Sequence, residues 1–314
     1  MKKQAVVLVA GAINTDLVGL MDRAPEAGET ITGTGFAVFG GGKAANQAVA
    51  VARTGGAAYL VGAVGDDQFG KDRLADLDAD RVDTSSVEVI AGGTSGVALI
   101  LVENGGENRI AYIPGTTLQV TPEATLAAYE RIRPDLVLAP NEVPHGALRS
   151  LLEAARSNNV RTMLNAAPDP TTSVDLLENV DILIVNEHEA IEMLGQTVAD
   201  HGDAAMKLAQ RYALTAVVTA GADGVYAGDG GQSLHVAGIP VEAVDTTGAG
   251  DAFCGAFAAE LAGGATLEEA LRFAVQAASI SVTRHGAQAS IAYRNEVVAA
   301  MAECHQGMGS GCGR

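Results

Sequence analysis

Short apolar segments rich in Val, Ile and Leu alternate along the chain with longer segments in which Ala and Leu recur at helical spacing. The short segments match buried strands, and the longer ones match helices with one apolar stripe. This alternation predicts an α/β fold with a mostly parallel central sheet flanked by helices. Strands are predicted at Val6–Val9, Ala58–Val61, Leu136–Leu138, Thr162–Asn165, Ile182–Val185 and Ala216–Val218, and helices at Pro122–Arg131, Pro144–Ser157, Glu187–Leu194 and Ala204–Tyr212.

Two stretches interrupt the alternation, Thr15–Phe39 and Ser95–Ile113. The second has strand patterns at Val97–Val102 and Arg109–Ile113 across the turn Glu103-Asn104-Gly105-Gly106. Both stretches are predicted to project as β-ribbons and to build a small β-sheet that serves as a lid; a dimer interface or plain decoration are the alternatives. The predicted body comprises residues 1–14, 40–94 and 114–314, and the predicted lid comprises residues 15–39 and 95–113.

The composition limits the classes of partner. The chain has 314 residues, of which 48% are hydrophobic, and its formal net charge is −18. No basic stripe offsets this charge, so neither nucleic acid nor an anionic membrane is expected as a partner. The longest apolar runs are too short to span a bilayer, and Met1-Lys2-Lys3 precedes a strand without a cleavable signal pattern, which predicts a cytoplasmic protein. The Gly-rich residues His305–Arg314 are expected to be frayed.

The segment Asp245-Thr246-Thr247-Gly248-Ala249-Gly250-Asp251-Ala252-Phe253 places a carboxylate after a run of small residues that closes a loop and opens a helix. Amide groups at a helix start point outward and attract anions, so Gly248, Ala249 and Gly250 are candidates for an anion hole. Asp251 stands where it can accept a proton from a hydroxyl aimed at the same anion. The segment predicts phosphoryl transfer to an alcohol; the alternative is an ordinary strand-to-helix turn with Asp251 as a first-turn carboxylate.

A second cluster is Gly40-Gly41-Gly42-Lys43-Ala44-Ala45-Asn46-Gln47-Ala48. Its glycines permit close approach of the backbone to a ligand, and Lys43 and Asn46 lie one helical turn apart. It is not a Walker A loop, because Ala37 replaces the first Gly and Ala44 replaces the Ser or Thr that binds magnesium. No dinucleotide-binding fingerprint follows the first strand. Taken alone, the cluster also fits a solvated loop.

Together these segments resemble the ribokinase family of carbohydrate and nucleoside kinases, and the resemblance extends over nearly the whole chain. Both family signatures are present in order, as Gly41-Gly42-Lys43…Asn46 and as Asp245–Asp251. The resemblance implies a ribokinase-like fold, ATP as the phosphoryl donor, Mg²⁺ with the nucleotide and Asp251 as the general base.

The segment Gly11-Ala12-Ile13-Asn14-Thr15-Asp16 resembles the ribokinase segment that ends the first strand and binds sugar hydroxyls. Carboxylate and amide groups suit vicinal diols, because together they accept and donate hydrogen bonds. A turn cap or a surface amide is the alternative for each residue taken singly. The resemblance implies acceptor contacts from Asn14, Asp16, Gly41, Gly42, Lys43, Asn46, Glu142 and Asp251.

The nucleotide motifs follow later strands. Asn186-Glu187-His188-Glu189 resembles the family N-x-x-E motif, in which the Glu orders magnesium-bound water, so Glu189 is expected to act on Mg²⁺ through water. Thr219-Ala220-Gly221-Ala222-Asp223-Gly224 resembles the T-x-G-x-x-G turn that holds ATP phosphates, although its glycines also suit a plain turn. The resemblance implies ATP contacts from Asn186, Thr219, Ala220, Gly221, Ala222, Asp223, Gly224, Gly250 and Val275.

The segment Ser281–Ser290 resembles the ribokinase stretch that, with the second signature, binds a monovalent cation mainly through backbone oxygens. A K⁺ ion there would stiffen the loop that carries the anion-binding amides. A helix-to-loop segment without an ion is the alternative. The implied K⁺ site comprises Asp245, Thr247, Ser281, Arg284, Gly286 and Ser290.

The resemblance implies ATP-dependent phosphorylation of the primary 5-hydroxyl of D-ribose to ribose 5-phosphate, by a homodimer joined through the lid. A sister kinase for fructose, pseudouridine or adenosine is an alternative, because Tyr112-Ile113-Pro114 differs from the usual lid segment. Two other departures are Ala44, which replaces a Gly and is expected to crowd the sugar pocket by a methyl, and Val275, which replaces a polar residue facing adenine. A non-catalytic sugar-binding regulator is disfavoured by the intact Asp251 and Glu189, and a nicotinamide-dependent oxidoreductase by the missing fingerprint.

Overall fold

The computed structural model describes residues 4–105 and 107–309, with side chains described as far as Glu303. Its main sheet has the strand order β13-β12-β11-β10-β9-β8-β1-β4-β5. Seven neighbouring strands of this order, β11-β10-β9-β8-β1-β4-β5, run parallel to one another. Strands β12 and β13 pair antiparallel at the other edge. The predicted mostly parallel sheet is therefore confirmed. Its strands are β1 (Val6–Ala10), β4 (Ala57–Gly65), β5 (Asp83–Ile90), β8 (Leu136–Pro140), β9 (Arg161–Asn165), β10 (Ile182–Asn186), β11 (Thr215–Thr219), β12 (Val225–Asp229) and β13 (Gln232–Val236).

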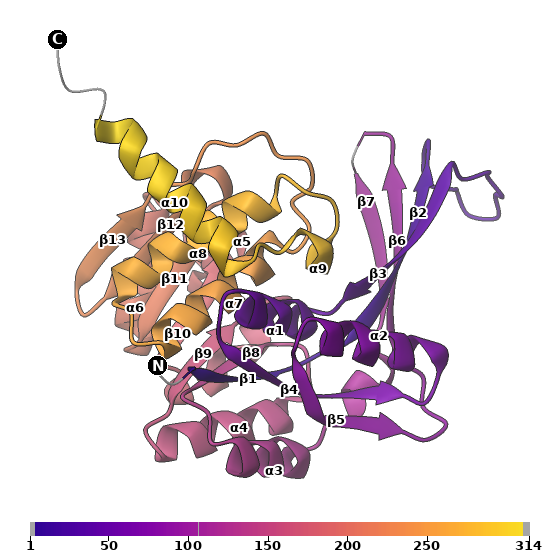
Figure 1. Ribbon diagram of the computed structural model, residues 1–314, viewed down its shortest axis with the longest axis horizontal. Coiled ribbons are helices and arrows are strands. Elements are labelled where there is room, and N and C mark those ends of the chain that lie inside the picture. The colour runs from indigo at the N-terminus through magenta and orange to yellow at the C-terminus, as the bar shows by residue number, and fades with distance from the viewer. Residues whose placement is uncertain (1–3, 106, 310–314) are drawn as a thin grey trace.

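Helices cover both faces of this sheet (Figure 1). Val7 and Val9 of β1 pack in one cluster with α1, α7 and α8, whereas Leu8 and Ala10 pack in another with α3 to α6. Because side chains alternate across a strand, a strand buried on both faces needs the continuous apolar run seen in the sequence. The helices are α1 (Lys43–Arg53), α2 (Gln68–Ala79), α3 (Pro122–Ile132), α4 (His145–Ser157), α5 (Glu187–Leu194), α6 (His201–Tyr212), α7 (Ala249–Ala262), α8 (Leu267–Ser281), α9 (Ala287–Ser290) and α10 (Arg294–Gly309).

Some helices begin or end at other residues than predicted, because capping side chains determine where a helix starts. Helix α6 starts three residues before the predicted Ala204, because the Asp200 side chain accepts the Asp203 amide at 2.8 Å and caps the helix there. The prediction of a frayed end was wrong for residues 305–309, which continue α10, and residues 310–314 lie outside the described residues. No helix within residues 4–105 and 107–309 has the length and hydropathy needed to cross a bilayer.

The interruptions in the sequence pattern form a separate sheet with the order β3-β2-β6-β7. It stands away from the body (Figure 1). Its strands are β2 (Asn14–Met21), β3 (Gly35–Gly41), β6 (Gly96–Glu103) and β7 (Asn108–Ile113). We call these four strands the lid sheet. Strand β2 pairs antiparallel with β3 and parallel with β6, so two segments far apart in the sequence depend on each other.

Candidate active site

The predicted motifs meet at the edge of the main sheet where its parallel strands end. Asn186 at the end of β10 is in register with Thr219 at the end of β11, and Pro140 at the end of β8 is in register with Asn165 at the end of β9. The carboxyl ends of parallel strands are where α/β folds bind ligands. Helices α1 and α7 begin beside this edge and bring Lys43 and Asp251 to it.

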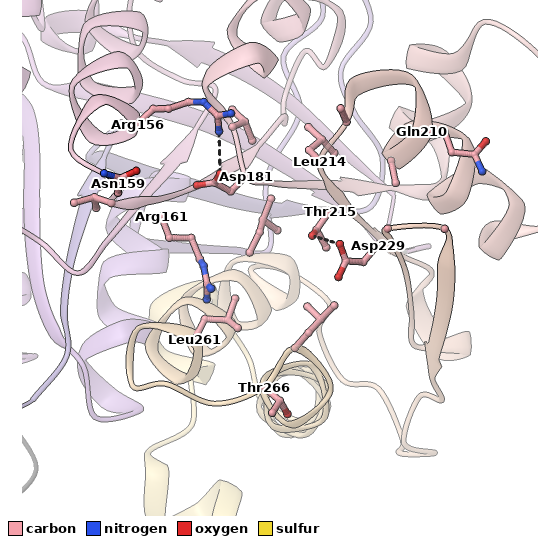
Figure 2. Close-up of a pocket in the computed structure, with 18 of the residues that line it drawn as sticks. Arg156, Asn159, Arg161, Asp181, Gln210, Leu214, Thr215, Asp229, Leu261 and Thr266 are labelled. Carbon is pink, nitrogen blue, oxygen red and sulfur yellow. Dashed lines mark hydrogen bonds and ion pairs between the residues drawn. The ribbon is translucent and has the colours of Figure 1, made fainter.

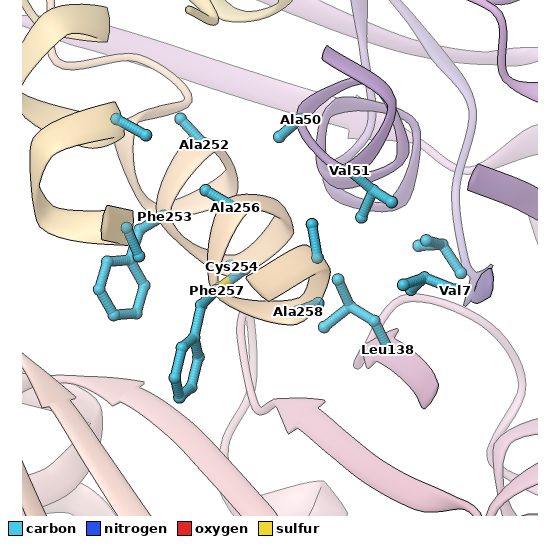
Figure 3. Packing of buried hydrophobic residues seen from close by; sticks show 14 of the residues in the cluster. Val7, Ala50, Val51, Leu138, Ala252, Phe253, Cys254, Ala256, Phe257 and Ala258 are labelled. Atoms are coloured by element: carbon cyan, nitrogen blue, oxygen red, sulfur yellow. The ribbon is translucent and has the colours of Figure 1, made fainter. Parts of the chain in front are cut away.

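Helices α1 and α7 pack with their backbones unusually close (Figure 3). A Cβ atom added at Gly255 would overlap with the Ala50 methyl and with the Gln47 carbonyl oxygen. Only glycine fits at this contact, and the small residues Ala50, Ala252 and Ala256 belong to the same buried cluster. The contact lies one helical turn from Asp251, so it determines how Asp251 faces α1.

Asp251 is buried, with 7% of its surface exposed. Its Oδ2 atom accepts a hydrogen bond from Asn46 Nδ2 at 2.9 Å, and its Oδ1 atom accepts one from Gln47 Nε2 at 2.9 Å. Burial raises the pKa of Asp251, while Lys43 and the two amides act in the opposite direction. Asp251 is therefore a fixed carboxylate at the start of a helix, in the position predicted for a general base.

Lys43 lies among carboxylates at the start of α1. Burial acts to lower its pKa, but Asp251, Glu142 and Glu189 act to raise it, and the net shift is upward. Lys43 therefore stays an ammonium group. The chain supplies a positive charge beside Asp251 where an anionic phosphoryl group would need one.

Glu142 holds backbone groups together rather than pointing both oxygens at an open site. Its Oε2 atom accepts the amides of Ala12 and Ala44 at 3.1 Å each, and its Oε1 atom accepts the amide of Lys43 at 3.0 Å. Burial raises the pKa of Glu142 to about 7, against the effects of these amides and of the Lys43 charge. Glu142 thus braces the start of α1 against the loop after β1; its contact with an acceptor stays a prediction.

The sugar-binding segment runs from the body into the lid sheet. Asn14 of β2 pairs with Gly41 of β3, and a Cβ at Gly41 would overlap with the Asp16 carboxylate. Gly42 has a φ of 91°, and a Cβ there would overlap with the Ala12 carbonyl oxygen, which explains why glycines are needed. Burial raises the pKa of Asp16 to about 6, and Arg73 opposes this shift.

Buried amide oxygens without a hydrogen-bond partner at this edge include Asn14 Oδ1 and Asn46 Oδ1, which belong to the two predicted sugar-binding segments. Each residue is only 5% exposed. Buried polar atoms without partners are rare in folded proteins because each one costs free energy. Hydroxyl groups of a sugar would satisfy both oxygens, so the chemistry of these residues fits a polyol acceptor.

The position of the Ala44 methyl group is defined, although its effect on the sugar pocket stays a prediction. Ala44 is fully buried, and a Cβ added at Gly11 would lie 2.5 Å from the Ala44 methyl. The methyl group packs against the loop after β1. The extra carbon of Ala44 is therefore accommodated by the glycine at position 11.

The anion loop has the predicted helix start. Gly248 has a φ of 75° and immediately precedes α7, which begins at Ala249. The amide of Ala249 donates to the Thr246 carbonyl oxygen at 3.3 Å, and Gly250 has open space around its Cα. The geometry suits approach of an anion to Gly250, while the part of each amide in an anion hole stays a prediction.

The two loops of the predicted K⁺ site are joined by Asp245. Its Oδ1 atom accepts the Thr247 amide and its Oδ2 atom accepts the Gly286 amide, both at 2.9 Å. Ser281 and Ser290 hydroxyls donate to helix carbonyls three residues earlier, at 2.9 and 2.8 Å, and the Arg284 guanidinium pairs with Glu296 at 2.5 Å. Within the described residues, no three His, Cys, Asp or Glu side chains cluster as metal ligands. Backbone oxygens would have to supply such a site, as the resemblance implies.

The nucleotide motifs form two structured turns. Asn186 and Glu189 build a reciprocal capping box at the start of α5, with side-chain to amide distances of 2.8 Å in both directions. The turn after β11 is closed by bonds of 2.9 Å from the Ala220 amide to Gly224 and from the Asp223 amide to Ala220. Gly224 has a φ of 92° and no room for a side chain beside Val236, so its glycine is required.

Comparison with known proteins decides the family. A family model described as pfkB family carbohydrate kinase matches residues 4–293. The chain belongs to this kinase family. It is 39% identical over 292 residues to ribokinase of Bacillus subtilis, covering 93% of this chain and 97% of the relative.

Solved ribokinase structures share the fold of this carbohydrate kinase over almost the entire length. Ribokinase of Thermotoga maritima has a TM-score of 0.86 and 32% identity, covering 95% of this chain and 99% of that chain. Arabidopsis thaliana ribokinase complexed with ribose and ATP has a TM-score of 0.84 and 28% identity, covering 94% and 98%. The ribokinase-like fold predicted from the motifs is confirmed.

A large cavity of this kinase lies elsewhere, at the amino ends of β9, β10 and β11 (Figure 2). Its volume is about 1150 Å³, and Arg161, Asp181, Thr215 and Asp229 line it. Arg156 pairs with Asp181 there at 3.0 Å. None of the predicted site residues lines this cavity, so it takes no part in the candidate chemistry.

Sequence reasoning missed three residues of the candidate site. Gln47 and Asn165 form a buried link to Asp251. Burial raises the pKa of the Tyr112 hydroxyl in β7, and a hydrogen bond with the Asn14 side chain acts in the opposite direction. The available signal for Gln47 was a polar residue within an otherwise Ala- and Val-rich helix. Tyr112 stood out only as a departure from the usual lid segment.

Proposed function

We propose that this kinase phosphorylates the 5-hydroxyl of D-ribose with ATP, in the cytoplasm. The observation that carries the proposal is the buried Asp251 carboxylate at the start of α7, held by two amides of α1 and faced by the Lys43 ammonium group. The names of relatives support ribose as the acceptor, because the ribokinases of Bacillus subtilis and Schizosaccharomyces pombe are each 39% identical to this chain.

The acceptor is held between the lid sheet and the body. Asp16 and Asn14 come from β2, while Lys43 and Asn46 come from α1. The unpartnered oxygens of Asn14 and Asn46 accept sugar hydroxyls, and the Asp16 carboxylate accepts two more O–H bonds. Gly41 and Gly42 let the backbone approach the sugar closely, and Glu142 keeps α1 in place beneath it.

ATP is held at the ends of β10 and β11 and at the start of α7. The turn from Thr219 to Gly224 binds the phosphates, and Val275, only 8% exposed on α8, supplies an apolar wall for adenine. Glu189 would hold Mg²⁺ through water, as a carboxylate suits this ion, and its charge acts to raise the pKa of Lys43. Mg²⁺ bound with ATP neutralises phosphate charge.

The reaction follows from these positions. Asp251 accepts the proton of the 5-hydroxyl, and the sugar oxygen forms a bond to the γ-phosphorus as the bond from that phosphorus to the bridging oxygen of ADP breaks. The amides of Gly248, Ala249 and Gly250 stabilise the charge on the transferred group. The products are ribose 5-phosphate and ADP, with the proton on Asp251 released to water afterwards.

A K⁺ ion is proposed behind this loop, held mainly by backbone oxygens near Asp245, Thr247, Ser281, Arg284, Gly286 and Ser290. The link from Asp245 to the Gly286 amide supports this position, because it joins the two loops that would surround the ion. The ion would stiffen the loop that carries the anion-binding amides and would not take part in bond making.

A coupled ADP-release assay with ribose, fructose, adenosine and pseudouridine tests the proposed acceptor, with K⁺ present or replaced by a larger organic cation. We expect ribose to have the highest kcat/KM and K⁺ to raise it. A higher kcat/KM for a nucleoside or for fructose would assign the chain to a sister activity. ADP release with none of the acceptors would favour a sugar-binding regulator.

Ribose binding is expected to weaken as the pH falls through about 6, the pKa of Asp16. The sign follows from the titration: above this pKa Asp16 is a carboxylate that accepts two O–H bonds, and below it the protonated group loses part of this capacity. Calorimetric titration of ribose without ATP measures the effect separately from catalysis.

The variant Arg73→Met is expected to move this midpoint to higher pH, because the Arg73 charge opposes the raised pKa of Asp16. A ribose affinity that does not change with pH across this range would contradict the role of Asp16. A midpoint that moves to lower pH in Arg73→Met would contradict the role of Arg73.

We also propose that the lid sheet joins two copies of the chain in a homodimer. The lid sheet exposes large apolar side chains, with Phe36 71% and Leu99 44% exposed. Exposed apolar patches of this kind mark interaction surfaces. The double variant Phe36→Ser, Leu99→Ser is expected to be monomeric in light scattering coupled to gel filtration. The matched control Val298→Ser removes a 50% exposed side chain from α10 and is expected to stay dimeric; a dimeric double variant would place the interface elsewhere.

A further inference from the structure

Gln47 is a buried polar side chain that has no role in the proposed reaction. It lies in α1, one residue after Asn46, and none of its surface is exposed. Its Nε2 atom donates to Asp251 Oδ1 at 2.9 Å and to Asn165 Oδ1 at 3.3 Å. The Asp251 carboxylate can only accept, so the amide nitrogen must face it, and both N–H groups of Gln47 are then in use.

The link continues into the main sheet. Asn165 ends β9, is 9% exposed, and its Nδ2 atom donates to the Ile184 carbonyl oxygen of β10 at 3.4 Å. Because Asn165 donates there, its oxygen is turned toward Gln47. The orientation of the Gln47 amide is therefore set by the backbone of β10 and not by solvent.

The two amides on Asp251 have different surroundings. The amide oxygens of both residues have no hydrogen-bond partner, but Asn46 is 5% exposed and lies where the acceptor is proposed to bind, whereas Gln47 is fully buried. Gln47 instead connects Asp251 to the sheet. Hydrogen bonds donated to a carboxylate favour its charged form, whereas burial favours the protonated form that cannot act as a base.

We propose that Gln47 is a positioning residue that holds Asp251 in its ionised form and in one orientation through the buried link to Asn165. This inference rests on the proposed function, in which Asp251 is the general base. Removal of the Gln47 amide removes one donor to the ionised form. A larger fraction of Asp251 is then protonated at a given pH, and turnover is lost at a higher pH than in the unmodified enzyme.

Other charged groups also act on Asp251 and must be kept constant. Lys43 of α1 favours the ionised form of Asp251. The negative charge of Asp251 in turn acts to raise the pKa values of Glu142 after β8, Asp16 of β2 and Cys254 of α7. Glu189 of α5 acts on Lys43 and Cys254. None of these side chains changes in a Gln47 variant.

The test is the pH dependence of kcat, at saturating ribose and ATP, for Gln47→Met. Methionine has a similar length and no N–H group. We expect the acid limb of the profile to move up by about one pH unit, the size of one lost hydrogen bond to a charged group. Above the limb, kcat should recover to within a few-fold of that of the unmodified enzyme.

The matched control is Gln276→Met in α8, which removes another buried amide, 5% exposed and bonded to Ser279 Oγ at 3.1 Å. Its acid limb is expected not to move. If Gln47→Met does not fold by circular dichroism, Asn165→Ala is measured instead, with an upward shift of smaller size expected. An unmoved limb in the folded variant, whether or not kcat falls uniformly, overturns the inference.

A separate measurement distinguishes failure of this inference from failure of the proposed function. If Asp251→Asn keeps full turnover, Asp251 is not the base and the proposed function fails with the inference. If Asp251→Asn loses turnover but Gln47→Met leaves the limb unmoved, only the role of Gln47 fails.

Discussion

Replacement of Asp251 by Asn is expected to lower turnover by roughly 10²- to 10⁴-fold while ATP affinity stays nearly unchanged. Asn keeps the size of the side chain but cannot accept a proton from the acceptor hydroxyl. The proposed ATP contacts lie on other residues, at the ends of β10 and β11, on α8 and in the backbone at the start of α7. Steady-state ADP release and equilibrium nucleotide binding measure the two effects separately.

Glu260→Gln provides the control on the same helix. Glu260 pairs with Arg294, far along α7 from the anion loop, and its loss is expected to change turnover by less than about twofold, as for most partly exposed ion pairs. Thermal unfolding of both variants checks that each is folded. Full turnover in folded Asp251→Asn would exclude Asp251 as the base.

Replacement of Gly255 by Val is expected to reduce both stability and turnover. The added side chain would overlap with Ala50 and with the Gln47 carbonyl oxygen, so α7 must move away from α1. Overpacking of this kind costs about 1–3 kcal/mol, and displacement of a catalytic group by about 1 Å can cost about 10²-fold in rate. Denaturant unfolding and kcat measure the two losses, and Gly255→Ala should show smaller losses of both.

Gly146→Ala is the matched control, since it adds a methyl group to another helical glycine. The nearest atom to its Cβ is Pro122 Cγ at 3.7 Å, so the methyl group fits. Gly146 is the second residue of α4, where the preference for Ala is smaller than the about 1 kcal/mol of a helix interior, and unchanged or slightly raised stability is expected. Unmodified stability and turnover in Gly255→Val would show that the contact between α1 and α7 does not position Asp251.

Much of the fold was predictable because its signals are local. Buried parallel strands require continuous apolar runs, and the predicted strands lie within β1, β4, β8, β9, β10 and β11. The lid sheet was predictable from the interrupted pattern, but the parallel pairing of β2 with β6 was not. That pairing joins segments about eighty residues apart, and neither segment carries a local sequence pattern that predicts its partner.

The candidate site was predictable only for residues that stand in short sequence motifs. Asp251, Lys43 and Asn46 stand in short motifs, and the structure brings them together. Gln47 gave no such signal, because its partners Asp251 and Asn165 are over a hundred residues away. The site of the Ala44 methyl also could not be predicted, since it depends on the packing of Gly11 across the loop after β1.

The pairing of Asn14 and Asp16 with the lid sheet has a thermodynamic consequence. These two proposed acceptor ligands lie in β2, whereas Asp251 and Lys43 lie on helices of the body. If the lid sheet moves relative to the body, these proposed ligands move with it, and acceptor binding and lid movement are then linked equilibria. Any free energy that favours an open lid reduces acceptor affinity by the same amount. If the proposed dimer also favours the lid position that binds the acceptor, ribose affinity becomes a function of protein concentration, with dilution weakening it.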